Sequence, residues 1–310
     1  MRVGSSWVWH LVVPLWLLED KPALFWSPRQ HLPIWMPSST KSVVTVHDLV
    51  WKTHPKTMPF LQRLSERVWM PSSVKKSDAI IAVSQTTRST LEDSLPYSNG
   101  KVCVIKHASL VKRSADYSSC VHQDRNHFLA VGTLEPRKNY VRLIRAFNLY
   151  SRSGGQKDLV IVGRDGWKTA AMYRELDDSP YRERIHVMHD VTDQKLVELY
   201  TKAFCLVSTS LDEGFGLPLL EARAFGLPLC ISAIPIYQEL FADAEVWFDP
   251  KSVHQIADSF QKISSCRCEY VPRFNSTSGS KDLERCRAEH RNLFLKVLGE
   301  VNDRGVLIDS

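Results

Sequence analysis

Two kinds of apolar pattern alternate along most of the chain. Short runs rich in valine and isoleucine predict buried strands, and longer runs with apolar residues three or four positions apart predict amphipathic helices. Ahead of residue 109 the pattern predicts strands at 42–49, 79–84 and 101–108, and helices at 60–78 and 85–95. Ser84 stands where a residue that caps the second helix is expected.

A longer series of alternating elements follows a polar stretch. Residues 109–126 have no apolar period and contain several serines, which is typical of a linker. After them the pattern predicts strands at 127–134, 158–166, 184–191, 204–210, 228–233 and 245–249. Helices are expected at 137–152, 168–178, 193–203, 218–226, 236–242 and 252–263. Such alternation implies parallel sheets with right-handed crossovers, and hence an α/β fold.

The two series define two domains of unequal completeness. Residues 127–281 contain enough strands for a doubly wound sheet, whereas residues 1–108 show about three, where such a sheet usually has about five or six. We therefore expect the first domain to be incomplete. Residues 282–310 begin with an amphipathic helix that we expect to pack back on the first domain.

The apolar segment WVWHLVVPLWLL, at residues 7–18, resembles neither a signal peptide nor a membrane span. It contains His10 and Pro14, and no small-residue cleavage site follows it. It is also shorter than the roughly 20 residues that cross a bilayer. We predict a helix that packs against the body of the protein.

Composition narrows the class of protein only modestly. Apolar residues make up 44% of the chain and charged residues 24%, which argues against extensive disorder. The net charge of +6 suits solubility or an anionic partner. The seven cysteines are scattered and odd in number, which favours reduced thiols in the cytoplasm over a disulfide framework. Cys266 and Cys268 have no second pair at zinc spacing, so no metal site is expected.

Polar clusters follow five of the predicted strands, at the edge of a parallel sheet where ligands bind. They are His47 with Asp48, Arg137 with Lys138, residues 163–167, His189 with Asp190, and residues 213–217. Four of the five belong to the second domain, so we expect the binding site mainly there.

The sequence EGFGLPLLE, at residues 213–221, places two carboxylates eight positions apart around two glycines and a proline. The glycines let the backbone approach a ligand closely. A helix that begins near Pro218 would point its free N–H groups at that ligand, and such a helix end favours phosphate. Arg137 and Lys138 add two cations, and the carboxylates can accept hydrogen bonds from sugar hydroxyls. The set therefore predicts a site for a nucleotide sugar.

These segments resemble the signatures of the retaining GT-B glycosyltransferases of family 4, also called glycosyl transferases group 1. EGFGLPLLEARAFGLPL is similar to the family's E-x7-E motif, and VGTLEPRKNYVRLIRAF to its diphosphate-binding segment. VTVHDLVWKTHP and IIAVSQTTRSTL are similar to its first-domain signatures. The resemblance covers most of residues 20–265. It implies a GT-B fold, in which two Rossmann-like domains face a cleft, with the first domain incomplete here.

The resemblance implies a catalytic group of four side chains. Arg137 and Lys138 would neutralise the diphosphate as it leaves, and Glu213 would contact hydroxyls of the transferred sugar. His47 would reach the donor sugar from the first domain. The family works without a metal, and the donor is a substrate, so no cofactor is expected.

A donor-binding group is implied in the same way. Glu221 would bind the ribose hydroxyls, and backbone N–H groups would hold the sugar and the distal phosphate. The remaining members of this group are Gly132, Phe215, Gly216 and Leu217.

On this basis we expect an enzyme that transfers a hexose of the mannose or glucose type with retention of configuration. The donor would be GDP- or UDP-linked, and the acceptor a glycan or a lipid-linked molecule. Cell-envelope polysaccharide synthesis in the cytoplasm would be the usual setting, and peripheral contact with the inner face of the membrane is compatible with it.

Two departures from the family pattern keep an alternative open. Thr133 stands where some members have arginine, and nothing before residue 20 resembles their initial strand and glycine-rich loop. The alternative is a truncated remnant that binds nucleotide sugar without transferring it. A gene that continues upstream with a glycine-rich start would favour the enzyme. A nucleic-acid binder is disfavoured, because the chain carries no motif of that class.

Overall fold

The computed structural model of this chain describes residues 6–108, 125–265 and 278–299. Contacts group the chain into two compact units. The first contains residues up to 53, residues 60–107 and residues from 283 onward, and the second contains residues 54–59 and 108–282. The linker expected at 109–126 lies almost wholly outside the described residues, as do Cys120, Cys266 and Cys268.

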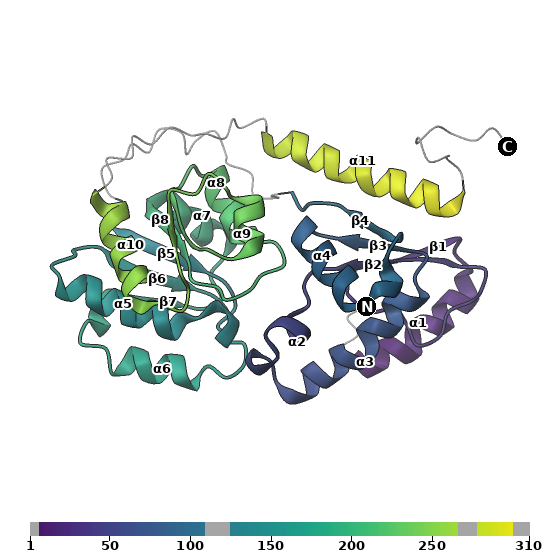
Figure 1. Cartoon of the computed structure of the whole chain (residues 1–310), viewed down its shortest axis with the longest axis horizontal. Coiled ribbons are helices and arrows are strands. Elements are labelled where there is room, and N and C mark those ends of the chain that lie inside the picture. The colour runs from purple at the N-terminus through teal and green to yellow at the C-terminus, as the bar shows by residue number, and fades with distance from the viewer. Residues whose placement is uncertain (1–5, 109–124, 266–277, 300–310) are drawn as a thin grey trace. The chain divides into compact units, whose positions relative to one another are not determined.

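The first unit contains a four-stranded parallel sheet in which strand order follows chain order (Figure 1). Its strands are β1 (Leu24–Ser27), β2 (Lys41–Val46), β3 (Ala79–Ala82) and β4 (Val102–Val104). The prediction of three strands in this part of the chain is wrong, because the sequence pattern misses β1. That strand has four residues, none of them β-branched, and prolines 22 and 28 flank it, so the aromatic pair Phe25 and Trp26 gives only a weak strand signal.

The structure contains the helices predicted for this unit and adds the short helix at Val50–Thr53 and one 3₁₀ turn. They are α1 (Ser6–Asp20), α2 (Val50–Thr53), α3 (Phe60–Lys76), α4 (Gln85–Ser94) and most of α11 (Ser278–Leu298), with a 3₁₀ turn, η2, at Pro96–Ser98. The helix expected at 7–18 is confirmed as α1, and the ring of its His10 stacks on Trp69 of α3 with 4.9 Å between ring centroids. The expected cap is also confirmed, since Ser84 Oγ accepts the N–H of Thr87 at 3.0 Å.

Helix α11 packs against the sheet of the first unit. Leu293, Phe294 and Val297 recur at helical spacing and contact a buried cluster. That cluster consists of Val43, Ala79, Ile81 and Ile105. The amphipathic pattern at the C-terminal end of the described chain therefore reflects a covered face.

The second unit contains a six-stranded parallel sheet with the order β10-β9-β8-β5-β6-β7. Its strands are β5 (His127–Val131), β6 (Asp158–Val162), β7 (Ile185–Met188), β8 (Ala203–Ser208), β9 (Leu229–Ser232) and β10 (Val246–Phe248). All six were predicted, and their order, read from β7, is that of a doubly wound sheet. The helices are α5 (Tyr140–Arg152), α6 (Ala170–Asp177), α7 (Asp193–Lys202), α8 (Leu217–Ala224), α9 (Pro235–Leu240) and α10 (Val253–Ser265), with 3₁₀ turns η1 (Pro55–Thr57), η4 (Pro136–Lys138) and η5 (Arg182–Arg184).

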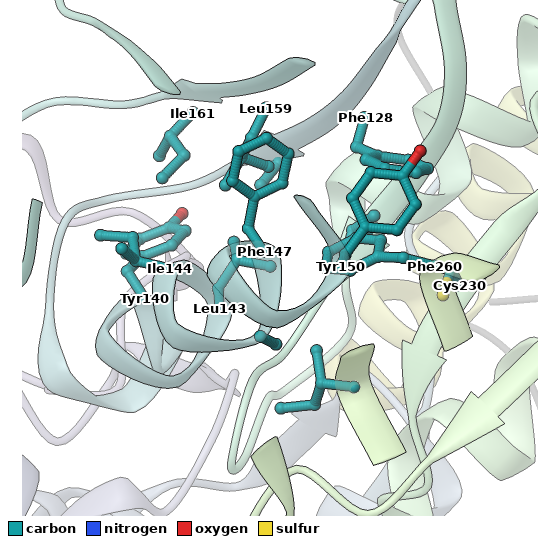
Figure 2. Close-up of a cluster of buried hydrophobic side chains, with 14 of the residues drawn as sticks. Phe128, Tyr140, Leu143, Ile144, Phe147, Tyr150, Leu159, Ile161, Cys230 and Phe260 are labelled. Atoms are coloured by element: carbon teal, nitrogen blue, oxygen red, sulfur yellow. The ribbon is translucent and has the colours of Figure 1, made fainter. Parts of the chain in front are cut away.

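Helices cover both faces of this sheet because successive strand residues point in opposite directions. Phe128 of β5 faces α5, α6 and α10, whereas its neighbour Leu129 faces α7, α8 and α9. Figure 2 shows Phe147 and Tyr150 of α5 directed toward the sheet, beside Phe128 and Phe260. The rings of Phe128 and Phe260 lie 4.5 Å apart between centroids. This packing holds α5, and the turn that precedes it, against β5.

Candidate functional site

The candidate site lies where the strand order of the second sheet reverses. Strands β5 and β8 are neighbours, and Leu129 of β5 pairs with Leu206 of β8. Residues 132–139 follow the carboxyl end of β5, and residues 209–216 follow that of β8. Doubly wound sheets bind ligands in the crevice at this switch point. Two loops that carry predicted site residues are therefore brought side by side.

Arg137, Lys138 and Glu213 meet in a cluster of ion pairs. Lys138 Nζ donates to Glu213 Oε1 at 2.5 Å, and Arg137 Nη1 donates to Glu213 Oε2 at 2.6 Å. Arg137 Nη1 also donates to the carbonyl oxygen of Asp212 at 2.9 Å. None of the three clustered side chains is more than 14% exposed. The structure thus joins three of the four predicted catalytic residues across the switch point.

A second carboxylate, that of Glu135, completes this cluster. Arg137 donates to Glu135 Oε1 from Nε at 2.9 Å and from Nη2 at 2.7 Å. Sequence reasoning missed Glu135, although this residue lies within the quoted segment VGTLEPRKNYVRLIRAF, two positions before Arg137. We call Glu135, Arg137, Lys138 and Glu213 the charge cluster. Its two cations and two carboxylates make it neutral when all four groups are ionised.

Burial and charge act in opposite directions on the carboxylates of the charge cluster. Burial raises the pKa of Glu213, but Lys138 and Arg137 outweigh burial and hold that pKa at about 2. Ser210 Oγ also donates to Glu213 Oε1, at 2.8 Å. Burial raises the pKa of Glu135 above its ordinary value, and Arg137 offsets part of this effect. Glu213 is therefore negatively charged throughout the physiological pH range.

Gly216 allows the loop after β8 to turn into helix α8. Its φ is 93°, in the left-handed region, and a Cβ atom there would lie 2.9 Å from the ring of Tyr237. Helix α8 begins at Leu217 and has Pro218 in its first turn. The first N–H groups of a helix have no intrahelical acceptor, so this end carries a partial positive charge. The predicted backbone donors at 215–217 are thus placed at a helix N-terminus.

Glu221 lies within α8 and is held by Tyr200 of α7. The Tyr200 hydroxyl donates to Glu221 Oε2 at 2.7 Å, and the Tyr200 ring stacks on Phe225 with 5.2 Å between centroids. Burial raises the pKa of Glu221, and the hydrogen bond from Tyr200 lowers it in part. Tyr200 is a second residue that sequence reasoning missed. One Glu221 oxygen is fixed, and carboxylates have further lone pairs that can accept hydroxyl donors.

Gly132 lies against the side chain of Lys138. A Cβ atom at Gly132 would lie 3.0 Å from Lys138 Cε, so glycine leaves room for the lysine. The Gly132 carbonyl accepts the hydroxyl of Tyr140 at 3.0 Å, which ties the end of β5 to the start of α5. Gly132 therefore supports the position of Lys138.

His47 belongs to the first unit, at the end of β2. Its Nε2 donates to the carbonyl of Pro28 at 2.8 Å, because a carbonyl oxygen can only accept. Its ring stacks on that of His107 with 5.5 Å between centroids. Burial, with a smaller effect of His47, lowers the pKa of His107 to about 4, so His107 is neutral at physiological pH. A role for His47 in contact with the donor sugar stays a prediction.

Two properties of the described residues bear on the partners of the site. Within residues 6–108, 125–265 and 278–299, no three His, Cys, Asp or Glu side chains gather as a metal site would require. No helix in these ranges combines the length and the apolarity that crossing a bilayer requires. Cys205 and Cys230 are buried free thiols, as predicted.

Comparison with known protein families shows to which family the chain belongs. The family described as "Glycosyl transferases group 1" matches residues 117–278, which contain the charge cluster, and "Glycosyltransferase Family 4" matches residues 5–108. The chain belongs to the group 1 glycosyl transferases. The resemblance of the four motifs to this family is confirmed.

Two curated relatives of this chain are named as mannosyltransferases of the O-antigen chain. The O-antigen chain mannosyltransferase RfbU of Salmonella typhimurium is 27% identical over 250 residues, which cover 77% of this chain and 67% of the relative. The O-antigen chain mannosyltransferase B of Escherichia coli is 27% identical over 275 residues, covering 81% of this chain and 70% of the relative. The matched region thus spans about two thirds of the length of these relatives.

The fold of this group 1 member is similar to that of solved glycosyltransferases. A structure titled as trehalose-6-phosphate from E. coli bound with UDP-2-fluoro glucose has a TM-score of 0.70 and 11% identity. The match covers 95% of this chain and 78% of that one. The expected GT-B class, with parallel sheets in two α/β domains, is confirmed.

Proposed function

We propose that this chain transfers a hexose from a nucleotide diphosphate sugar to a glycan or lipid-linked acceptor, with retention of configuration. The observation that carries the proposal is the charge cluster at the switch point of the second sheet. The names of the relatives support a hexose of the mannose type and a role in cell-envelope polysaccharide synthesis. The donor would be GDP- or UDP-linked, and the expected cytoplasmic location stays a prediction.

The diphosphate of the donor would replace Glu213 as the partner of the two cations. Lys138 and Arg137 each make one short bond to Glu213 in the structure. Guanidinium and ammonium groups bind phosphate oxygens as well as carboxylates. Once released, Glu213 would accept hydrogen bonds from hydroxyls of the transferred sugar. Glu135 would keep its two bonds to Arg137 and hold the guanidinium in place.

The other donor-binding residues fit a nucleotide sugar around this position. The N-terminus of α8, with the backbone of Phe215, Gly216 and Leu217, would hold the sugar and the distal phosphate. Glu221, fixed by Tyr200, would accept the ribose hydroxyls.

In the reaction, the bond between C1 of the hexose and the phosphate oxygen breaks, and a bond forms from C1 to the acceptor oxygen on the same face. The acceptor's proton passes to the departing phosphate oxygen. Negative charge grows on the diphosphate during this step, and Arg137 and Lys138 stabilise it. These cations do the work of a divalent metal ion, so transfer should survive EDTA. Loss of transfer on chelation, restored by Mn²⁺ or Mg²⁺, would contradict this part of the proposal.

A second candidate is a protein that binds nucleotide sugar without transferring it. The four-stranded sheet of the first unit, smaller than the six-stranded sheet of the second, favours this candidate. A panel of GDP- and UDP-hexoses, offered with lipid-linked glycans, separates the two. Transfer, with an NMR spectrum showing the donor's anomeric configuration in the product, supports the enzyme. Calorimetric binding without transfer supports the second candidate. If the chain shows no binding and no transfer, both candidates are refuted.

A further inference from the structure

Asn139 lies between the 3₁₀ turn η4, which carries Arg137 and Lys138, and helix α5, and its backbone has an unusual conformation. It follows Lys138 directly, is 4% exposed, and has φ 64° and ψ 31°, in the left-handed region. An asparagine at this position ordinarily caps the helix by accepting an N–H from its first turn. The Asn139 side chain makes no such bond. Its polar atoms are engaged elsewhere.

The Asn139 amide connects three segments that are distant in sequence. Its Nδ2 donates to the carbonyl of Thr209 at 3.1 Å and to that of Pro250 at 2.7 Å. Its Oδ1 accepts from Arg142 Nη1 at 2.9 Å. Two buried carbonyl acceptors require a side chain with two N–H donors at one atom, which aspartate lacks. The loops after β8 and β10 are therefore tied to the residue next to Lys138.

Two further bonds join the turn at 136–139 to the loop after β8. The N–H of Leu211 donates to the carbonyl of Arg137 at 2.9 Å. Thr209 Oγ1 donates to the carbonyl of Lys138 at 2.9 Å. Both cation-bearing residues thus have their backbone carbonyls fixed by the loop that carries Glu213. Asn139 adds a hydrogen bond from its own side chain to the backbone carbonyl of Thr209 in that loop.

We infer that Asn139 is a positioning residue of the diphosphate site. Its amide clamps the turn at 136–139 to the loop at 209–213, which places Lys138 and Arg137 opposite Glu213. The inference rests on the proposed function, because it takes the charge cluster to be the diphosphate site. Displacing a binding group by about 1 Å can cost about 100-fold in activity, so a clamp of this kind affects function as well as stability.

Asn139→Gly is the most informative variant. Glycine tolerates the left-handed conformation and adds no charge, so the variant removes the amide alone. Inorganic pyrophosphate is the probe, because it tests the diphosphate site whatever the sugar. We expect its calorimetric dissociation constant to rise about tenfold. In a Lys138→Ala background the same change should have a smaller effect, since one of the two cations that Asn139 positions is then absent.

Asn148→Ala is the matched control. Asn148 also lies on α5 and accepts a hydrogen bond from Ser179 Oγ at 2.6 Å, but it takes no part in the charge cluster. This variant should bind pyrophosphate as the unmodified chain does. Hydrogen exchange reports the clamp directly: the Leu211 amide should exchange faster in Asn139→Gly and at the original rate in Asn148→Ala.

Each outcome decides a separate point. Unchanged exchange at Leu211 in Asn139→Gly would overturn the clamp. Faster exchange with an unchanged pyrophosphate affinity would overturn the positioning role. An unmodified chain that binds no pyrophosphate would overturn the proposed diphosphate site itself, and the exchange rates would then judge the clamp alone.

Discussion

Replacing Glu213 by glutamine should destabilise the second unit and, at the same time, strengthen its binding of anions. The substitution keeps the shape of the side chain but removes its negative charge from the charge cluster. Arg137 then retains Glu135 as its carboxylate partner, whereas Lys138 loses the carboxylate to which it donates. The cluster changes from neutral to a net charge of about +1. Two nearby buried cations repel each other unless an anion lies between them.

The expected loss of stability follows from the pKa of Glu213. A fall from the ordinary value of 4.5 to about 2 means that the folded protein favours the ionised carboxylate. One pKa unit corresponds to about 1.4 kcal/mol, so the ionised group contributes about 3 kcal/mol to the free energy of unfolding. In a domain of this size, a loss of about 3 kcal/mol lowers Tm by about 6–12 °C.

The expected gain in anion affinity has the same origin. Pyrophosphate binding to the unmodified chain must displace Glu213 from both cations, whereas in Glu213→Gln no carboxylate competes at that position. Removing one unit charge at close range is worth more than about 1.4 kcal/mol, so we expect binding to tighten at least about tenfold. Transfer activity should nevertheless fall, because a neutral amide offers one acceptor oxygen and binds sugar hydroxyls more weakly than the proposed carboxylate would.

Chemical denaturation and calorimetry with pyrophosphate measure both effects on the same samples. Glu245→Gln is the matched control, because Glu245 pairs with the buried Arg223 at 2.9 Å in the same unit but away from the charge cluster. It should lose stability without gaining affinity for pyrophosphate. Unchanged stability together with weaker pyrophosphate binding in Glu213→Gln would refute the reasoning, because Glu213 would then not compete for the cations.

Three further predictions concern the same unit. Lys138→Ala should lower kcat more than it lowers donor affinity, because negative charge on the diphosphate grows in the transition state. A rise in KM at constant kcat would show that Lys138 contributes only to ground-state binding. Tyr200→Phe should weaken UDP or GDP binding by about three- to tenfold, since Glu221 loses the hydrogen bond that orients it, and unchanged calorimetric affinity would remove Tyr200 from the site. Because the pKa of Glu213 is depressed in the folded protein, the contribution of Glu213 to stability is complete above about pH 4.5 and is lost as pH falls toward 2. If acid titrations of unfolding coincide for the unmodified chain and Glu213→Gln, this prediction is disproved.

The sequence pattern predicts the second unit almost completely. Runs such as DLVIV at β6 are apolar, β-branched and bounded by polar residues, and each became a strand of the six-stranded sheet. The parallel order also placed Arg137, Lys138 and Glu213 at one edge before any contact was known. Strand β1 was missed for the opposite reason, since LFWS is short and lacks β-branched residues. It becomes a strand by pairing with β2, which is a tertiary effect.

The contacts within the site could not be predicted from the sequence. Asn139 falls inside the helix predicted at 137–152, and its actual partners, at 209 and 250, are chosen by the strand order. Glu135 belongs to the quoted segment VGTLEPRKNYVRLIRAF without a role of its own there, and Tyr200 belongs to no quoted motif. They matter because of what lies beside them, Arg137 in one case and Glu221 in the other. Local patterns identify the charged residues, whereas the topology of the sheet decides which of them meet.

A carboxylate inside a proposed phosphate site has a physical reason. Arg137 and Lys138 are largely buried, and two buried cations without a partner would cost several kcal/mol in the absence of donor. Glu213 meets that need because β5 and β8 are neighbours, so the loops that follow them lie side by side. The same carboxylate can leave the cations when a diphosphate arrives, since it exchanges one set of hydrogen bonds for another with the sugar hydroxyls. Glu135, bonded to the other side of Arg137, need not move in this exchange. In the proposed function, Glu135 would therefore keep the guanidinium oriented in both states, while Glu213 would be the partner of the cations only until the donor binds.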